Sequence, residues 1–278
     1  MDVAFLSPFR RFPPLLALLV FWTGCAHQPS TRLPNQPKVV GLDIKGTDQV
    51  KASDIKEKIV TTKTPWYQRL NPFGEDSYFD PNTWQADLKR IVRYYQAQGF
   101  YAARIESTDQ KPQGKDAIAL EVVVNEGSPT LVGVLNVTGL EQLPEAHQKK
   151  ALAGLPLVPG EPFREEQWAG TKEQIQGRLH ELGYAEAEVG GEVEVDLANQ
   201  SATVNIRADT GPRYRFGNIF VATDANPQVN PRRIIEQAQG AVRKGDWFSE
   251  SSLADAQARV CRMGVFGAVK VNRGAPDR

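Results

Sequence analysis

The chain has 278 residues, 41% of them hydrophobic, which is enough for one large domain or for two to three small ones. Lysine and arginine together number 33, aspartate and glutamate also number 33, and the formal net charge is zero. A chain without a basic excess has no long-range field that attracts nucleic acid or acidic lipid. We therefore expect no nucleic-acid partner.

The N-terminal segment has the layout of a signal peptide. Two arginines precede the apolar run LLALLVFW, which ends at TGCA. The run is shorter than the roughly twenty residues of a membrane-spanning helix, so a cleaved segment is favoured over a permanent anchor. TGC at Cys25 is similar to the lipobox of bacterial lipoproteins, although Trp22 stands where that pattern prefers leucine. The resemblance implies a signal peptide over residues 1–24 and lipidation of Cys25; ordinary cleavage near Ala26 is the alternative.

The next block of sequence predicts a strand, a short helix and a long helix. Val39–Gly46 alternates apolar and polar residues as a strand does, and SDIKEKIV follows as a short helix that begins at Ser53. The long helix carries an apolar stripe with a 3.6-residue period. Its members are Trp84, Leu88, Ile91, Val92 and Tyr95. Gly99 is predicted to end this helix in a left-handed conformation.

Two strands are predicted after Gly99. FYAARIES comes first, then a turn at DQKPQGKD and then AIALEVVVNEG. The last segment alternates strictly, with Ile118, Leu120, Val122 and Val124 on one face, so one face is buried and the other is wet. The block is therefore an α+β module of order β-α-α-β-β, in which two helices lie on one face of a three-stranded mixed sheet.

The same module recurs. Gly183 lies 84 residues after Gly99, and identical residues continue at this offset, including the rare tryptophan. The pairs are Phe79 and Phe163, Trp84 and Trp168, Ile91 and Ile175, Gly127 and Gly211, and Gly133 and Gly217. A third, shorter copy has a predicted strand at 214–222, a short helix from Pro231 and Gly264 as its repeat glycine. Only 16 positions separate Phe248 from Gly264, against 20 in the other copies, so about one helical turn is absent.

These features resemble the POTRA domain of the Omp85 superfamily, in particular its BamA-like and TamA-like outer-membrane assembly proteins. The resemblance rests on the helix that ends at a glycine beside aromatics, on the junctions NEGSP and DTGPRYRFGNI, and on the tandem order. It implies a flexible leader at 25–37 and POTRA-like units at 38–127, 128–211 and 212–278. The last unit is expected to lack its final strand, and no membrane β-barrel is expected within the sequence.

The resemblance also implies a mechanism. In POTRA units the final strand is central and the strand after the repeat glycine lies at an edge, where an extended polypeptide could add a strand through main-chain hydrogen bonds. Which edge binds stays open, and a solvated edge without a partner is the alternative. The candidate residues are Phe100, Tyr101, Ala102, Ala103, Arg104, Ile105, Ala185, Glu186, Ala187, Glu188 and Val189.

Catalytic and metal-binding motifs are not found in the sequence. The three histidines, His27, His147 and His180, do not have metal-ligand spacing, and no nucleophile elbow or phosphate loop occurs. Cys261 is predicted to be a buried small hydrophobe. We expect no enzyme, no cofactor and no small-molecule substrate.

The expected protein is a periplasmic docking module anchored to the outer membrane of a Gram-negative-type envelope. Its expected partners are unfolded outer-membrane polypeptides or proteins of the assembly machinery. A freestanding structural lipoprotein, serving a cell-wall or division complex, remains the alternative.

Overall fold

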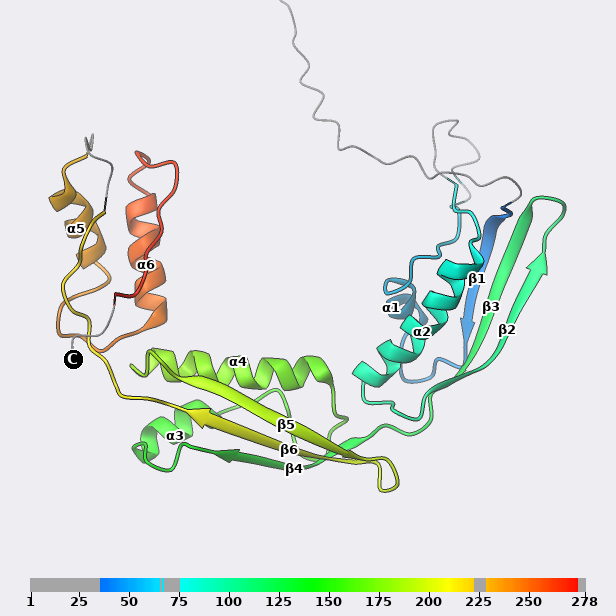
Figure 1. Cartoon of the computed structure of the whole chain (residues 1–278), viewed down its shortest axis with the longest axis horizontal. Coiled ribbons are helices and arrows are strands. Elements are labelled where there is room, and N and C mark those ends of the chain that lie inside the picture. The colour runs from blue at the N-terminus through cyan, green and yellow to red at the C-terminus, as the bar shows by residue number, and fades with distance from the viewer. Residues whose placement is uncertain (1–35, 66, 68–75, 223–228, 275–278) are drawn as a thin grey trace, which may run out of the picture. The chain divides into compact units, whose positions relative to one another are not determined.

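The computed structural model describes residues 36–65, 67, 76–222 and 229–274 (Figure 1). The predicted signal peptide, Cys25 and the leader up to residue 35 lie outside the described residues. The described residues form two three-stranded mixed sheets, each with two helices, followed by a segment with two further helices. The fold class is α+β, as predicted.

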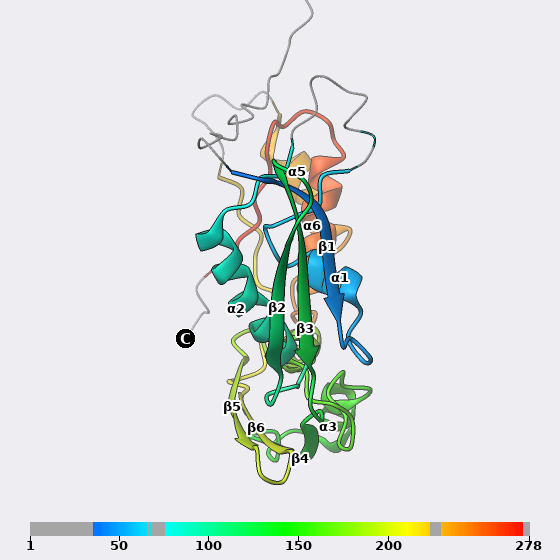
Figure 2. The same ribbon diagram turned by 90° about the vertical axis from the view of Figure 1, so that its right-hand side faces the viewer.

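The first module consists of β1 (Lys38–Lys45), α1 (Ala52–Lys56), α2 (Pro81–Ala97), β2 (Arg104–Pro112) and β3 (Ala117–Asn125). Its strand order is β1-β3-β2, so that β3 is central, parallel to β1 and antiparallel to β2. The two views in Figures 1 and 2 place α1 and α2 on the same face of this sheet. Asp80 caps α2, because its carboxylate accepts the Thr83 N–H at 2.8 Å, and Pro81 follows at the first helical position.

The core of the first module follows from the two periodicities of the sequence. Along β3 the alternate residues Ile118, Leu120, Val122 and Val124 are buried, as predicted. They pack with the buried face of α2, which includes Trp84, Ile91 and Tyr95. Burial of this apolar surface is the main favourable contribution to folding of the module.

The second module repeats this plan with β4 (Leu131–Thr138), α3 (Glu145–Leu152), α4 (Glu165–Glu181), β5 (Glu188–Asp196) and β6 (Ser201–Asp209). The strand order is β4-β6-β5, again with the final strand in the centre. Ala202, Val204, Ile206 and Ala208 of β6 pack in one core with α3 and α4. Duplicated sequence has thus produced duplicated topology.

The third copy differs from the prediction. It contains α5 (Pro231–Gln239) and α6 (Glu250–Cys261), but residues 214–222 do not form the predicted strand and make only one isolated bridge, Arg215 to Trp247. In the first two modules the equivalent strands, β1 and β4, pair with the central strand. Within the described part of the third copy no such strand is available, so the alternating pattern has nothing to pair with.

Two smaller predictions were wrong. Ser53 lies inside α1, whose N-cap is Lys51 without a side-chain hydrogen bond. Cys261 is exposed, because the buried stripe of α6 runs through Ala256 and Val260, and the next residue points about 100° away from Val260. Pro231, in contrast, stands at the first position of α5 behind the capping residue Asn230, as predicted.

Candidate functional site

In the described part of the chain the outer edges of β2 and β5 are open over their whole length, whereas those of β1 and β4 are covered at one end. The outer edge of β1 is partly covered, because Val39 N–H donates to Ser77 O at 2.8 Å, and Thr64 N–H donates to Val39 O at 2.9 Å. The outer edge of β4 is covered in the same way by residues 160–161. For β2 and β5 the described residues contain backbone bonds only to the central strands. Their outer N–H and C=O groups are therefore available to another strand.

The candidate edge residues lie mostly before these strands rather than in them. Arg104 and Ile105 begin β2, and Glu188 and Val189 begin β5. The other seven form a turn between the helix end and the strand, so they do not belong to the open edges. These seven are Phe100, Tyr101, Ala102, Ala103, Ala185, Glu186 and Ala187.

The turn has a structural role of its own. Phe100 is buried with its ring edge-on to Tyr95 at 6.0 Å, and its N–H donates to Tyr95 O at 2.9 Å. Ala103, Ala185 and Ala187 are also buried. The aromatic after the glycine therefore closes the helix end onto the core, and strand pairing starts only beyond it.

The repeat glycine connects one copy to the next. Gly99 has φ +93° and its carbonyl accepts the Thr130 N–H at 2.8 Å, while Thr130 O accepts the Phe163 N–H at 2.8 Å. A Cβ at Gly99 would lie 2.2 Å from Phe163 O. The next junction repeats this geometry with Gly183, Tyr214 and Phe248, at 2.8 and 3.0 Å. Glycine is thus required by both its φ and the close approach of the following copy.

A groove runs between α2 and the open strand β2. Its volume is about 320 Å³, and its apolar lining consists of Leu88 and Val92 on α2 and Ile105 on β2. The polar residues Gln85, Lys89, Arg93 and Gln96 also line it. A strand added to β2 would direct every second side chain toward this groove, because side chains alternate across a sheet.

The corresponding surface of the second module is filled. Leu88 and Val92 correspond by the 84-residue offset to Lys172 and Gln176, which are polar. Trp168 reaches β5, where a Cβ at Gly191 would lie 2.7 Å from its ring, and the Lys172 ammonium lies 4.3 Å from the centre of that ring. The space that is open beside β2 is therefore occupied beside β5 by an indole and an ammonium group.

The two open edges also differ in charge. β2 carries Arg104 and Lys111 together with Glu106 and Asp109, and Lys111 pairs with Glu121 of β3 at 3.0 Å. β5 carries four acidic residues, Glu188, Glu192, Glu194 and Asp196, and no basic one. Charged edge strands are a common protection against unwanted pairing, so the acidic β5 is the less receptive edge.

Arg93 joins the groove to the next copy. Its guanidinium donates two hydrogen bonds to the Glu165 carboxylate, at 2.8 and 2.6 Å, and the pKa of Arg93 is raised by these bonds and by the charge of Glu165. Arg93 therefore serves the helix junction at the end of the groove.

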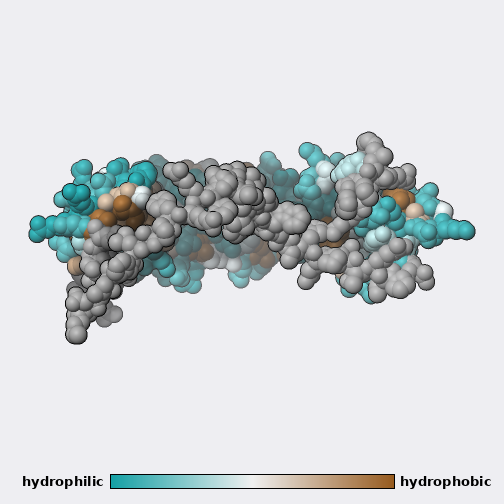
Figure 3. All heavy atoms as spheres, turned by 90° about the horizontal axis from the view of Figure 1, so that it is seen from above, coloured by the Kyte–Doolittle hydropathy of each residue, from teal (hydrophilic) through white to brown (hydrophobic). Residues whose placement is uncertain are grey.

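Cofactor sites are not found in the described residues. No group of three or more His, Cys, Asp or Glu side chains there is placed to hold a metal ion. None of the helices in this part of the chain is long and apolar enough to cross a membrane. On the face shown in Figure 3 the described residues are mostly hydrophilic, and apolar residues appear in small patches.

Sequence reasoning missed the groove and the partners of the repeat glycines. The signal for the groove was present, because the 84-residue offset replaces two apolar helix positions of the first copy by polar ones in the second. The partner of Gly99, the backbone of Phe163, could not be read from the pattern, since it belongs to the following copy.

Comparison with known proteins identifies the two repeated modules. The family model POTRA, described as "Surface antigen variable number repeat", matches residues 37–127 and 131–211. The outer membrane protein assembly factor BamA of Neisseria meningitidis is 23% identical over 220 residues, which are 77% of this chain and 26% of that protein. BamA of Nitratidesulfovibrio vulgaris is 24% identical over 195 residues, 66% of this chain and 22% of that protein.

The chain thus spans about a quarter or less of these curated relatives. Among solved structures, POTRA3-5 of Haemophilus influenzae BamA is 21% identical, with a TM-score of 0.49, over 86% of this chain and 91% of that one.

Proposed function

The chain belongs to the POTRA family, and on this premise we propose that it is a periplasmic docking module of an outer-membrane protein assembly or translocation system. Its relatives are named as outer membrane protein assembly factors. In this proposal the chain binds an extended client or partner polypeptide by strand addition. No chemical step is required of it.

The observation that carries the proposal is the open edge of β2 beside an apolar groove. An added strand would bond to the outer backbone groups of β2 and place alternate apolar side chains against Leu88, Val92 and Ile105. The edge of β5 offers backbone groups but neither the groove nor a neutral charge balance. The first module is therefore the proposed binding module, and the bound segment has apolar residues at every second position.

Photo-crosslinking at matched positions of the two edges tests this assignment. A photo-reactive amino acid is placed at Asp109 on β2 or at Glu192 on β5. Both residues are exposed, and they pair with Glu121 and Asn205, which occupy equivalent positions of the two central strands. We expect covalent capture of unfolded outer-membrane proteins, identified by mass spectrometry, from Asp109 and much less from Glu192. Equal capture from both positions, or none from either, would contradict the assignment.

A second pair of variants tests the groove. Val92→Glu places a carboxylate on its apolar lining, and Gln176→Glu makes the equivalent change on α4. We expect Val92→Glu to reduce capture at Asp109 because burying a charge against apolar side chains is costly. Gln176→Glu is expected to leave this capture unchanged. If both variants reduce it equally, the groove has no part in binding.

Membrane attachment is proposed to occur through lipidated Cys25. The TGC sequence that ends the apolar N-terminal run supports this, as does the alanine that follows Cys25. Metabolic labelling with palmitate should mark the wild-type chain and leave Cys25→Ala unmarked and released from the outer-membrane fraction. A Cys25→Ala chain that stays in that fraction would disprove the anchor.

A further inference from the structure

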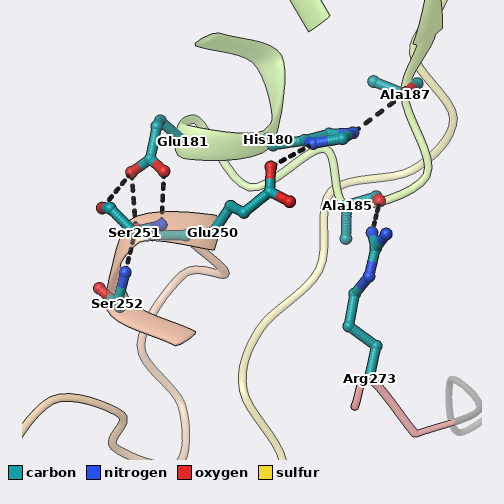
Figure 4. A network of polar contacts seen from close by, with 9 residues as sticks. His180, Glu181, Ala185, Ala187, Glu250, Ser251, Ser252 and Arg273 are labelled. Carbon is teal, nitrogen blue, oxygen red and sulfur yellow. Dashed lines mark hydrogen bonds and ion pairs between the residues drawn. The ribbon is translucent and has the colours of Figure 1, made fainter. Parts of the chain in front are cut away.

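A histidine lies at the contact between α4 and α6. The ring of His180 is buried, and Figure 4 shows it between the turn that follows α4 and the first residue of α6. Its Nε2 lies 3.1 Å from Ala187 O and its Nδ1 lies 2.8 Å from a carboxylate oxygen of Glu250. Both ring nitrogens therefore face an oxygen.

These two contacts require a doubly protonated ring. A backbone carbonyl only accepts hydrogen bonds, and an ionised carboxylate also only accepts, so each nitrogen of His180 must donate. A neutral imidazole has one N–H and can serve one of the two oxygens. If the neutral ring keeps its N–H on Nε2 and donates to Ala187 O, the lone pair of Nδ1 faces the anionic oxygen of Glu250. The ring and the carboxylate then repel each other instead of forming an ion pair.

The neighbouring junction provides an internal comparison. Glu165 and Glu250 are equivalent, since each stands two residues after a repeat phenylalanine, Phe163 or Phe248. The partner of Glu165 is Arg93, whose guanidinium stays charged at any physiological pH. The partner of Glu250 is a histidine, and histidine side chains change charge between about pH 5 and 8. The glutamate is thus the same in both junctions, whereas its partner is an arginine in one and a histidine in the other.

The other charged groups at this contact have partners of their own. Glu181 on α4 accepts the Ser251 N–H and the hydroxyls of Ser249 and Ser251, each at 2.7 Å. Burial, the largest single effect, raises the pKa of Glu181, but these bonds together hold it below the usual value. Arg273 binds Ala185 O, and Glu186 accepts from the Tyr214 hydroxyl at 2.7 Å. His180 is thus the histidine at this contact, and both of its ring nitrogens face acceptor oxygens.

We propose that His180 and Glu250 form a proton-controlled latch between α4 and α6. With the ring doubly protonated, the latch is closed and α6 is fixed to α4 by the His180–Glu250 ion pair in addition to the bonds of Glu181. When the ring loses its Nδ1 proton, the ion pair is lost and only the bonds of Glu181 remain. The orientation of α6 is then less restricted, so the third copy becomes more mobile as pH rises.

Distance measurement between spin labels tests the latch on the full chain with Cys25→Ser. One label is attached to the exposed Cys261 of α6 and the other to Glu173→Cys on the exposed side of α4. We expect the α4–α6 distance distribution to broaden between about pH 5 and about pH 8. A control pair, Lys89→Cys on α2 with Glu173→Cys and Cys261→Ser, spans the Arg93–Glu165 junction and should not change with pH.

Two variants separate the latch from other titrations. Glu250→Gln keeps a side chain that can accept from Nδ1–H or donate to the Nδ1 lone pair, so the distribution should become independent of pH. Because Glu250 is half exposed, this variant does not endanger folding. His180→Gln, which introduces the residue found at the equivalent position 96, should likewise remove the pH dependence. A pH-independent wild type, or a pH dependence that persists in Glu250→Gln, would overturn the proposal.

Discussion

One buried position shows how the three copies differ at the level of single residues. Asp87 is fully buried on α2, and its carboxylate accepts the Val60 N–H at 3.0 Å and the Thr61 N–H at 2.8 Å. At the equivalent place in the second copy, Thr171 accepts the Leu157 N–H at 3.1 Å. The third copy has Ala256 there, eight residues after its phenylalanine as in the other copies. The side chain at this position therefore accepts two backbone hydrogen bonds in the first copy and one in the second, and in the third copy it has no acceptor atom.

Asp87→Ala should lower the free energy of unfolding by about 2–4 kcal/mol, because two backbone N–H groups lose a charged acceptor. Burial, the largest effect, raises the pKa of Asp87, but hydrogen bonds from Thr61, Val60 and Arg90 bring it below normal. Since the folded-state pKa is depressed, this stabilisation is complete above the unfolded-state pKa of about 3.9 and is lost as pH falls through the folded-state value.

Urea unfolding at neutral and acid pH measures this effect. The difference between wild type and Asp87→Ala should shrink as pH falls below about 4. Arg90→Ala is the control, because its half-exposed guanidinium should contribute less than about 1 kcal/mol. A difference that stays constant down to strongly acid pH would show that the carboxylate is not responsible.

At the level of elements, the helix-ending glycine and the phenylalanine of the following copy act as a pair. The carbonyls of Gly99 and Gly183 accept the N–H groups of Thr130 and Tyr214, which stand at the start of the next copy. The carbonyls of Thr130 and Tyr214 in turn accept the N–H groups of the repeat phenylalanines. Gly264 has φ +70°, and apart from its chain neighbours no described residue places an atom within 4 Å of the position of its Cβ. Among the described residues, two of the three repeat glycines are thus part of a junction.

Gly99→Ala and Gly264→Ala separate these two requirements. Both variants force alanine into a left-handed conformation, at a cost of about 1–2 kcal/mol. Only at Gly99 does the new Cβ also collide with Phe163 O, so the junction must open. We expect faster hydrogen exchange at the Thr130 amide, which donates to Gly99 O, in Gly99→Ala alone. Unchanged exchange at Thr130 would mean that the junction tolerates a side chain.

The elements also show what the sequence could predict. Strict alternation in Ile118–Val124 and the apolar stripe of α2 correctly predicted a strand with one buried face and an amphipathic helix, while the central place of that strand was implied by the resemblance. The strand start after Gly99 was predicted four residues too early. Phe100 and Tyr101 favour strands locally, but the core at the helix end takes Phe100. For 214–222 the local strand pattern was misleading, because a strand also needs a partner, and the described residues of the third copy contain no final strand for it to pair with. The groove was not predicted, because it depends on how α2 packs against β2 in the folded module.

At the level of the whole molecule, the three copies are expected to differ in local stability. The first two cores contain large buried side chains from helices and strands. The buried cluster of the third consists of Ile234, Ala238, Val242, Ala256 and Val260, with Phe248 also buried, and in its described part no strand covers α5 and α6. Less apolar surface is removed from water, so the third copy should open at a lower cost in free energy.

Hydrogen exchange at three equivalent amides measures this difference. Ile91, Ile175 and Val260 each lie twelve residues after a repeat phenylalanine, and their side chains are buried. All three amides lie within helices, so local hydrogen bonding alone would protect them similarly. We expect the opening free energy to be high at Ile91 and Ile175 and lower at Val260, because the third helix lacks a sheet beneath it in the described residues. Equal protection of Val260 would mean that α5 and α6 stabilise each other without a sheet.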